Sequence, residues 1–538
     1  MRLLPIGLYL LATLGTSASC DTQRPPSAEQ VSGGLSIRLS SNDVSVQPGA
    51  SVSLTIKVKT TMALSGPAQL SLSYPDGSAL PQGIGFAFEP SSLTVPTGSE
   101  VQAQLRISAD ASIKISDYAL LVTVASAGRE ASIPVLVRIS DVGPQWARQI
   151  GTTGTDTAVA MTTDSQGNLY VAINSTGSVD GKSNQGDYDG YLLSYSPAGQ
   201  LRWTAQIASS KTDYITGLSV DRDDTLWVSG YTFGVLPSQT SPGRTDGFVA
   251  RFAQTGQRLW LRQFGTTEID KLTGISVSAQ GVATVVGNTE GSYGSGTNAG
   301  LTDIWIAQLA SDGKELSSLQ IGSDQGDTAN AVAVDANQVS FVVGNTEGIL
   351  PTGNALGLQD GFVLTVLPTG KLGWLRHVGS SGNDELLAAT TDDSGGVWVA
   401  GSTRGTLPGQ VSMGGQDGIL VRFVSDGSRT VTRQLGTSYL DTIQSLAWVS
   451  GKLYSVGTTR GAFADQDARG SYDFFVGRHG SDGSLAWVSQ NGTEQSDTAA
   501  AITGRGNQLF VAATTFGAFD NLLAIGDSDG FIQSLRVY

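Results

Sequence analysis

Aspartates at two regularly repeating positions are the side chains whose spacing most clearly suggests chemistry. One series precedes apolar runs: Asp189, Asp246, Asp303, Asp360, Asp417, Asp473 and Asp529. The other series has the same spacing of 57 or 56 residues: Asp156, Asp213, Asp270, Asp327, Asp384, Asp441 and Asp497. Several carboxylates together supply the hard oxygen ligands that Ca²⁺ prefers. The second series is therefore a candidate cation-binding set.

The same aspartates also have a structural interpretation. Aspartate at a turn commonly accepts hydrogen bonds from nearby backbone N–H groups. Repetition in seven copies favours that role, because a binding site is normally asymmetric. We therefore predict turn-capping aspartates and no cofactor, with bound Ca²⁺ as the alternative.

Other catalytic residue types are scarce. His377 and His479 are the two histidines, and Cys20 is the one cysteine, so a Cys/His zinc site is excluded. Both histidines lie within or beside runs expected to be outer strands, where we expect packing or surface roles. The run Gly526–Gly530 matches G-x-S-x-G, but it enters a strand and no histidine follows it, so we reject a nucleophile elbow.

The elements that carry the aspartates repeat seven times. A third series marks the same units at Trp146, Trp203, Trp260, Trp374 and Trp487, with Ser317 and Val431 in the two other copies. Each unit has four strand signals, and in the second unit these are 214–220, 226–230, 247–252 and 258–264. Repeats of this length with four strands each predict an all-β, seven-bladed β-propeller of four-stranded blades over residues 141–538.

The order of strands within a unit predicts how the ring is built. The first strand is rich in small residues and should lie at the axis, with the tryptophan strand outermost. Because the last unit lacks its outer strand, the segment from Trp146 to Ile150 should supply it and remove an open edge. We expect the series beginning at Asp189 to ring the channel mouth, with that beginning at Asp156 farther out.

The repeat resembles a known family. The order Trp-x-x-Gln-Phe/Ile-Gly, Asp-x-Ala, Gly-Asn-Leu-Tyr-Val and Asp-Gly-Phe is similar to the bacterial β-propeller repeats called SBBP repeats, over residues 146–538. It departs from the pattern at Ala208, Ser317, Val431 and Gln444. The resemblance implies fold and cell-surface context, and no common activity.

Loops between the second and third strands differ in sequence while the strands repeat, and binding usually resides in such loops. Their aromatic side chains are candidate ligand contacts: Tyr188, Tyr231, Phe233, Tyr293, Phe463, Tyr472, Phe516 and Phe519. They could stack on sugars or contact a protein partner, and some of them should pack within the loops.

The sequence of the N-terminal region predicts an export and anchoring segment. Residues 1–20 resemble a lipoprotein signal ending at Cys20, the predicted site of lipidation, and the alternative is a simple cleaved signal. Residues 21–34 are expected to be a flexible tether. Alternating runs over 35–140 predict an immunoglobulin-like β-sandwich.

Charge and composition narrow the function. The net charge of −15 and the lack of a basic tract exclude nucleic-acid binding. We predict a monomeric, non-enzymatic binding or scaffold protein of the cell envelope that contacts an envelope protein or polysaccharide. A hydrolase or lyase using paired aspartates is the alternative, since glycoside hydrolysis needs only two carboxylates. A quinone-cofactor dehydrogenase is a third reading, because Gly199 to Trp203 is similar to the tryptophan motifs of such propellers.

Overall fold

Alternating apolar residues build an N-terminal sandwich of two five-stranded sheets. The computed structural model describes residues 30–537 except 33, 47, 48, 111, 112, 114, 115, 140, 141, 352, 355, 465, 520 and 521. Cys20, the signal segment and residues 21–29 therefore lie outside the described residues. The strands are β1 (Gln30–Ser32), β2 (Leu35–Leu39), β3 (Asp43–Val46), β4 (Ser51–Thr60), β5 (Ala68–Ser73), β6 (Ile84–Glu89), β7 (Ser92–Leu93), β8 (Glu100–Ala109), β9 (Ser116–Ser126) and β10 (Arg129–Ile139).

The two sheets have the orders β1-β2-β4-β8-β6 and β3-β10-β9-β5-β7. In β4, Leu54, Ile56 and Val58 point into the core while the residues between them are more exposed. This period of two is what a half-buried strand requires. Strand β1 lies within the stretch expected to be a tether, and its pairing with β2 extends the sandwich to Gln30.

Seven four-stranded sheets form a second compact unit, and the boundary between the units falls between Gly143 and Pro144. Sheets 1 to 3 are β12 (Asp156–Thr163), β13 (Leu169–Ser175), β14 (Asp189–Tyr195), β15 (Leu201–Ile207); β16 (Asp213–Val220), β17 (Leu226–Thr232), β18 (Asp246–Phe252), β19 (Arg258–Phe264); and β20 (Asp270–Val277), β21 (Ala283–Thr289), β22 (Asp303–Leu309), β23 (Glu315–Ile321). Sheets 4 and 5 are β24 (Asp327–Val334), β25 (Ser340–Thr346), β26 (Asp360–Val366), β27 (Leu372–Val378); and β28 (Asp384–Thr391), β29 (Val397–Thr403), β30 (Asp417–Phe423), β31 (Arg429–Leu435). Sheets 6 and 7 are β32 (Asp441–Val449), β33 (Lys452–Thr459), β34 (Asp473–His479), β35 (Leu485–Asn491); and β36 (Asp497–Arg505), β37 (Gln508–Thr515), β38 (Asp529–Val537), β11 (Val142–Ile150).

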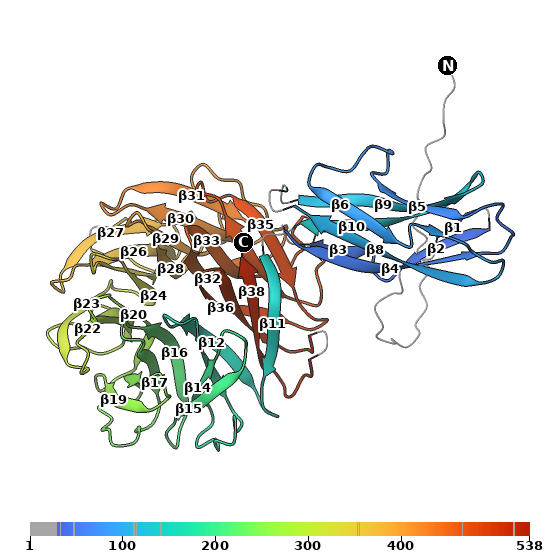
Figure 1. Cartoon of the computed structure of the whole chain (residues 1–538). Coiled ribbons are helices and arrows are strands. Elements are labelled where there is room, and N and C mark those ends of the chain that lie inside the picture. Colours follow the sequence, from blue (N-terminus) through green and yellow to red (C-terminus); the bar gives the residue numbers. More distant parts are fainter. Residues whose placement is uncertain are drawn as a thin grey trace, which may run out of the picture. The chain divides into compact units, whose positions relative to one another are not determined.

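The first strands of successive sheets contact one another around a closed ring, from β12 through β36 and back to β12. Figure 1 shows these strands around the centre and the fourth strands at the periphery, which is the arrangement of a β-propeller. In the second sheet, the bounds of the four observed strands agree with those predicted from the sequence to within two residues.

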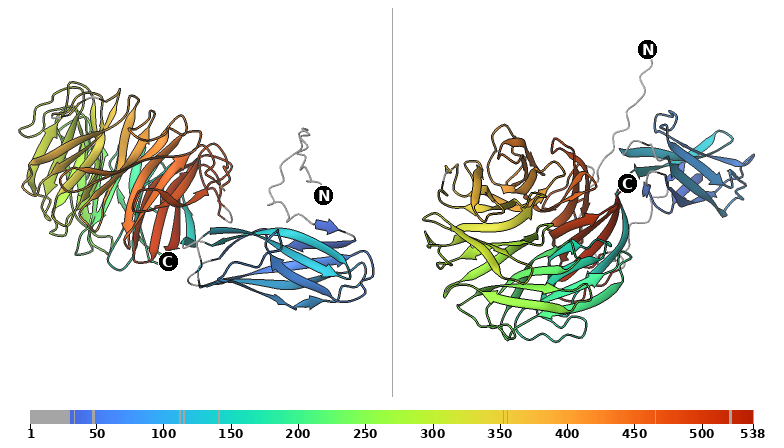
Figure 2. Two further views of the ribbon diagram at one scale, coloured as in Figure 1. Left: turned by 90° about the horizontal axis from the view of Figure 1, so that it is seen from above. Right: turned by 60° about the vertical axis from the view of Figure 1, so that its left-hand side comes forward.

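The ring closes as the sequence predicts. Strand β11 is the fourth strand of sheet 7, beside β38, and both views in Figure 2 place these two segments side by side. Gln149 of β11 donates a hydrogen bond of 2.7 Å from Nε2 to Asp529 Oδ2 of β38. The two ends of the repeat region are therefore joined within one sheet, which leaves no open seam.

Within the described part of the chain, no helix is long and apolar enough to cross a membrane.

Candidate functional site

Each aspartate of the second series accepts hydrogen bonds from the turn that precedes a first strand. Asp213, at the start of β16, is fully buried, and its Oδ2 accepts hydrogen bonds from Ser209 N (2.6 Å) and Ser209 Oγ (2.9 Å). A Ser or Thr four residues before the aspartate donates the same pair of bonds in each of the other six sheets. These bonds satisfy backbone N–H groups that would otherwise be buried without a partner.

The structure reverses the radial order expected for the two series. The second series begins the axial first strands, whereas the first series begins the third strands and lies farther out. Asp189 of the first series accepts hydrogen bonds from Gln185 N (2.7 Å) and Gln206 Nε2 (2.8 Å). All fourteen carboxylates are at most 2% exposed, so they hold turns rather than line an open mouth.

Burial raises the pKa of Asp213, hydrogen bonds from Thr232 and Ser209 oppose the rise, and the neighbouring Asp189 carboxylate adds to it. Among the described residues, no three His, Cys, Asp or Glu side chains are grouped so that they could hold a metal ion. Turn capping accounts for the contacts of these aspartates, and Ca²⁺ binding by the series stays a prediction.

Both histidine side chains are buried. In each of the six other sheets, a glutamine of the fourth strand donates a hydrogen bond to the first-series aspartate. His377 of β27 occupies the equivalent position in sheet 4, and its Nδ1 lies 3.9 Å from Asp360 Oδ2. His479, the last residue of β34, has Nε2 2.8 Å from Ser455 Oγ, and burial lowers its pKa to about 4. His479 and Ser455 are enclosed among packed strands, so the pair is no accessible nucleophile and base.

Neighbouring sheets are joined near the axis by side chains from the second strands. The Asn174 amide exchanges two hydrogen bonds with the backbone of Ile215 in the next sheet, at 3.0 and 2.9 Å. Asn288, Thr458 and Thr514 accept a hydrogen bond from the next first strand at the same repeat position. In sheet 2 this position is Tyr231, so a tyrosine replaces a residue that links sheets elsewhere.

Two tyrosines, Tyr214 and Tyr231, depart from the repeat, and they lie close to a third, Tyr188. Tyr214 stands where four other first strands have Thr, and its ring centroid lies 5.2 Å from those of both Tyr188 and Tyr231. Phe233, which is 47% exposed, continues the row at 6.1 Å from Tyr231. The four rings form an aromatic row across sheets 1 and 2, at the edge of the sheets where the second-to-third-strand loops emerge.

The aromatic row borders a cavity of about 440 Å³. Polar side chains share the lining with all three tyrosine rings of the row. The lining residues are Thr157, Val159, Asn174, Tyr188, Tyr214, Ile215, Thr216 and Tyr231. The Lys271 ammonium lies 5.4 Å from the centre of the Tyr231 ring, a cation–π contact that puts one positive charge beside the row. Burial raises the pKa of both Tyr214 and Tyr231, so both phenols are neutral hydrogen-bond donors at neutral pH.

Of the predicted loop aromatics, the structure brings together only Tyr188, Tyr231 and Phe233. Tyr293 packs on Trp305 at 4.5 Å and donates to Glu315, and Phe463 packs on Phe475 at 4.9 Å. Phe519 stacks on Phe531, Phe516 is 51% exposed, and Tyr472 is half-buried.

Sequence reasoning missed Tyr214 because it lies on a strand rather than in a loop. Its departure from the Thr of Thr157, Thr328, Thr442 and Thr498 is the signal that could have found it.

Comparisons with known proteins agree with the repeat architecture. Residues 145–178 match the SBBP β-propeller repeat, which supports the repeat family. A 427-residue stretch is 25% identical to the regulatory protein FlaEY of Caulobacter vibrioides, covering 70% of this chain and 44% of that protein. The chain thus spans less than half the length of this curated relative.

Solved structures resemble the chain only distantly. A quinonprotein alcohol dehydrogenase-like protein from Bacteroides thetaiotaomicron is 8% identical, with 84% of this chain and 94% of that chain covered and a TM-score of 0.35. An exotype rhamnogalacturonan lyase is 13% identical, with 95% and 90% covered and a TM-score of 0.33. Neither likeness assigns an activity to this chain.

Proposed function

We propose that this chain is a non-enzymatic binding protein of the cell envelope whose seven-bladed propeller holds a segment of envelope polysaccharide in the cavity beside Tyr188, Tyr214 and Tyr231. The observation that carries the proposal is the clustering of departures from the repeat. No other repeat has an aromatic residue at the Tyr214 position or at the Tyr231 position, and Tyr188 lies beside Tyr214.

The chemistry of the lining fits a sugar. A pyranose ring has an apolar face that packs on an aromatic ring and hydroxyl edges that need hydrogen-bond partners. Thr157, Asn174 and Thr216 supply polar groups beside the rings. Two of these are already engaged within the fold, since Thr216 Oγ1 donates to Leu272 O and the Asn174 amide bonds to Ile215. The tyrosine hydroxyls, Thr157 and Lys271 are therefore the groups that would contact sugar hydroxyls.

The cavity supports binding better than hydrolysis. Glycoside hydrolysis uses two carboxyl groups roughly 5–9.5 Å apart across the scissile bond. None of the eight lining residues is acidic, and the repeated aspartates are buried in turns. The curated relative is named a regulatory protein, a name that states no catalytic activity.

The rest of the chain would serve to present this cavity. In the proposal, Cys20 carries the lipid that anchors the monomer, and an immunoglobulin-like sandwich separates the anchor from the propeller. The sandwich lies between Cys20 and the propeller in the sequence, which is the order that a spacer requires.

Retention of envelope polysaccharide by residues 22–538 tests the function. Tyr214→Thr and Tyr231→Asn restore residue types that the repeat itself uses at these positions, so folding should survive. We expect each to weaken retention about tenfold, the effect of losing roughly 1.4 kcal/mol of ring contact. Tyr472→Ser, a residue type also found at that repeat position in Ser528, is the matched control and should retain full binding.

Equal retention by all variants would overturn the proposal. Capture of one stoichiometric protein in place of polysaccharide would assign the cavity to a protein partner. Shortening of the polysaccharide with time would favour the hydrolase or lyase alternative.

A further inference from the structure

Another cavity lies between sheets 4 and 5, away from the aromatic row of sheets 1 and 2. Its volume is about 390 Å³, and it borders the fourth strands β27 and β31. Arg376 of β27 and Arg429 of β31 line it, and none of its described lining residues is acidic. In a chain with a net charge of −15, this cavity is a local concentration of positive charge.

Aromatic rings hold both guanidinium groups in place. The Arg376 Cζ lies 5.6 Å from the centre of the Trp374 ring, and the Arg429 Cζ lies 5.5 Å from that of the Phe423 ring. The centres of these two rings are themselves 5.8 Å apart. Because a guanidinium that stacks by its face keeps its N–H groups at its edge, these contacts orient the donors without using them.

The fold uses only some of these donors. Arg376 donates from Nε to Gly427 O at 3.1 Å and from Nη1 to Leu375 O at 2.8 Å. Arg429 donates from Nη2 to His377 O at 2.9 Å. A guanidinium has five N–H donors, so both arginines keep N–H groups that a ligand can use.

The two arginines also lack the carboxylate partners that other arginines of the propeller have. Three ion pairs of 2.6–2.9 Å engage Arg251, Arg422 and Arg433. Within the part of the chain that the structure describes, neither Arg376 nor Arg429 makes such an ion pair. Two positive charges beside one cavity repel each other, and a bound anion would remove that cost.

The equivalent cavity between sheets 2 and 3 has a different charge. Arg262 stands there at the position of Arg376, but Glu315 stands at the position of Arg429. Glu315 accepts a hydrogen bond of 2.8 Å from Tyr293 Oη. No other pair of neighbouring sheets has arginine at both positions, so the two arginines are a feature of sheets 4 and 5 and not of the repeat.

Two further departures from the repeat border the same cavity. Neither ring nitrogen of His377 has a hydrogen-bond partner among the described residues. Gly353 lies directly against His377 Nε2, so a side chain at this position would clash with the imidazole. In sheets 2, 5 and 6 a glutamine stands at the Gly353 position and accepts from a backbone N–H of the fourth strand. Because sheet 4 forgoes bonds that other sheets make, the needs of the fold do not explain these changes.

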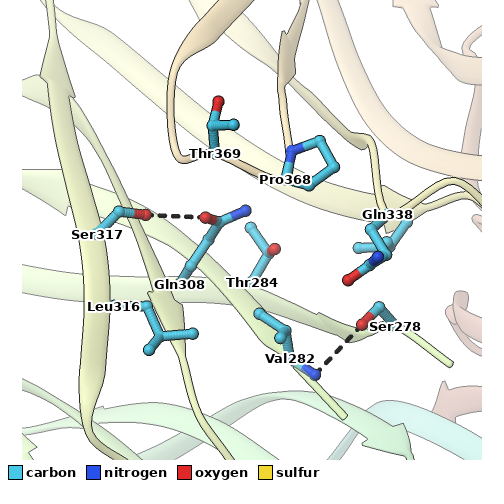
Figure 3. Close-up of a pocket in the computed structure, with 10 residues that line it drawn as sticks. Ser278, Val282, Thr284, Gln308, Leu316, Ser317, Gln338, Pro368 and Thr369 are labelled. Atoms are coloured by element: carbon cyan, nitrogen blue, oxygen red, sulfur yellow. Dashed lines mark hydrogen bonds between the residues drawn. The ribbon is translucent and has the colours of Figure 1, made fainter. Parts of the chain in front are cut away.

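The cavity between sheets 3 and 4 provides a comparison without charge. Ser317 and Thr284 stand there at positions where most other sheets have aromatic residues, and a space of about 90 Å³ remains (Figure 3). Gly370 of the next sheet lies directly against Ser317, and no described lining residue is charged. Open space between two sheets therefore does not by itself bring arginines together.

We infer that the cavity between sheets 4 and 5 binds an oxyanion, a carboxylate or a phosphate group, between the guanidinium groups of Arg376 and Arg429. The planar fork of a guanidinium matches two oxygens of either anion. The volume lies within the range of small-ligand sites, so a molecule as large as a sugar can carry the anion. The tyrosine cavity of the proposed function lies on other sheets, and either site can fail without the other.

Isothermal titration calorimetry of residues 22–538 at low ionic strength, with inorganic phosphate and separately with glucuronate, tests the inference. Arg429→Leu introduces the residue type of Leu201, Leu372 and Leu485 at this repeat position, so folding should survive. This variant should bind at least about tenfold more weakly, the effect of losing one charge-assisted hydrogen bond. Arg258→Leu, at the same repeat position in sheet 2, is the matched control and should bind as the parent does.

Stronger binding of phosphate would assign the site to phosphate groups, and stronger binding of glucuronate would assign it to the carboxylates of acidic sugars. Absence of both interactions in the parent would overturn the inference. Equal affinity of the parent and a folded Arg429→Leu protein would also overturn it. If Arg429→Leu fails to fold, Arg376→Leu, which introduces the residue type of Leu319, decides by the same criterion.

Discussion

Replacing Asp213 separates a turn-capping carboxylate from a cation ligand. Asp213→Ala removes the acceptor for Ser209 N and Ser209 Oγ in a fully buried turn. An unpaired buried donor costs about 1–3 kcal/mol, and the Ser209 hydroxyl can rotate toward another acceptor while the backbone N–H cannot. We therefore expect the alanine variant to lose about 2–3 kcal/mol of unfolding free energy.

Asp213→Asn provides the matched comparison. The amide oxygen still accepts from Ser209 N. Removing the charge also removes the cost of burying a carboxylate, which is the main cause of the raised pKa of Asp213, and the smaller repulsion from Asp189. We expect a loss under about 1 kcal/mol for this variant.

The pH dependence has a defined sign. Burial raises the folded-state pKa of Asp213, so protonation of this carboxyl favours the folded state. The part of the stability that comes from this pKa difference is present below the unfolded-state pKa of about 3.9 and is lost as pH rises through the folded-state pKa. The asparagine variant should lack this part of the pH dependence.

Denaturant unfolding followed by tryptophan fluorescence measures these effects. All nine tryptophans lie between residues 146 and 487, so the signal reports on the propeller and not on the sandwich. An alanine variant within about 0.5 kcal/mol of the parent, or an asparagine variant as unstable as alanine, would refute the capping account. A parent midpoint that falls when a chelator is added would favour Ca²⁺ bound by this series.

Three further substitutions test other contacts of the propeller by the same assay. His377→Gln should raise the unfolding free energy by about 1 kcal/mol, because glutamine makes the bond to Asp360 that six other sheets have; a loss of stability would contradict this. Trp203→Ser should lower it by about 3 kcal/mol through the loss of a ring packed between sheets, and a change under about 1 kcal/mol would count against that packing role. Asp392→Asn should lower it by about 1.5–3 kcal/mol, since hydrogen bonds from Arg422 outweigh burial and lower the pKa of Asp392 to about 2. The stability from Asp392 is present above about pH 3.9 and lost as pH falls through about 2, so equal acid sensitivity of parent and variant would contradict the pairing.

The repeat period made the strands predictable. Aspartate and tryptophan recur at a fixed spacing, so one repeat defines the strand positions in all seven, and the missing outer strand of the last repeat identifies the role of β11. The predicted radial order of the two aspartate series is wrong, because the second series begins the first strands, which pack around the axis, whereas the first series begins the third strands. Asp156 begins an axial strand and Asp189 a third strand.

The candidate site was only partly predictable. Variable loops correctly drew attention to Tyr188, Tyr231 and Phe233, but the same criterion included Tyr293 and Phe463, whose rings fold back onto their own sheets. Loop sequence alone does not say whether a ring turns inward, because that depends on the apolar surface left open beneath the loop.

Comparison between repeats carries more information than loop position. Tyr214 is found when each repeat position is compared across the seven copies, since a departure that no fold contact requires points to a ligand. The paired loss of aromatics at Thr284 and Ser317 is found in the same way, but only the structure shows that the two positions border one cavity.

The proposed binding site at the aromatic row is tested by the dissociation constant for envelope polysaccharide, measured for the parent and for Tyr214→Thr at matched stability. We expect about tenfold weaker binding by the variant, while its unfolding free energy stays within about 0.5 kcal/mol of the parent. Equal dissociation constants, with both proteins folded, would contradict a binding site at the aromatic row.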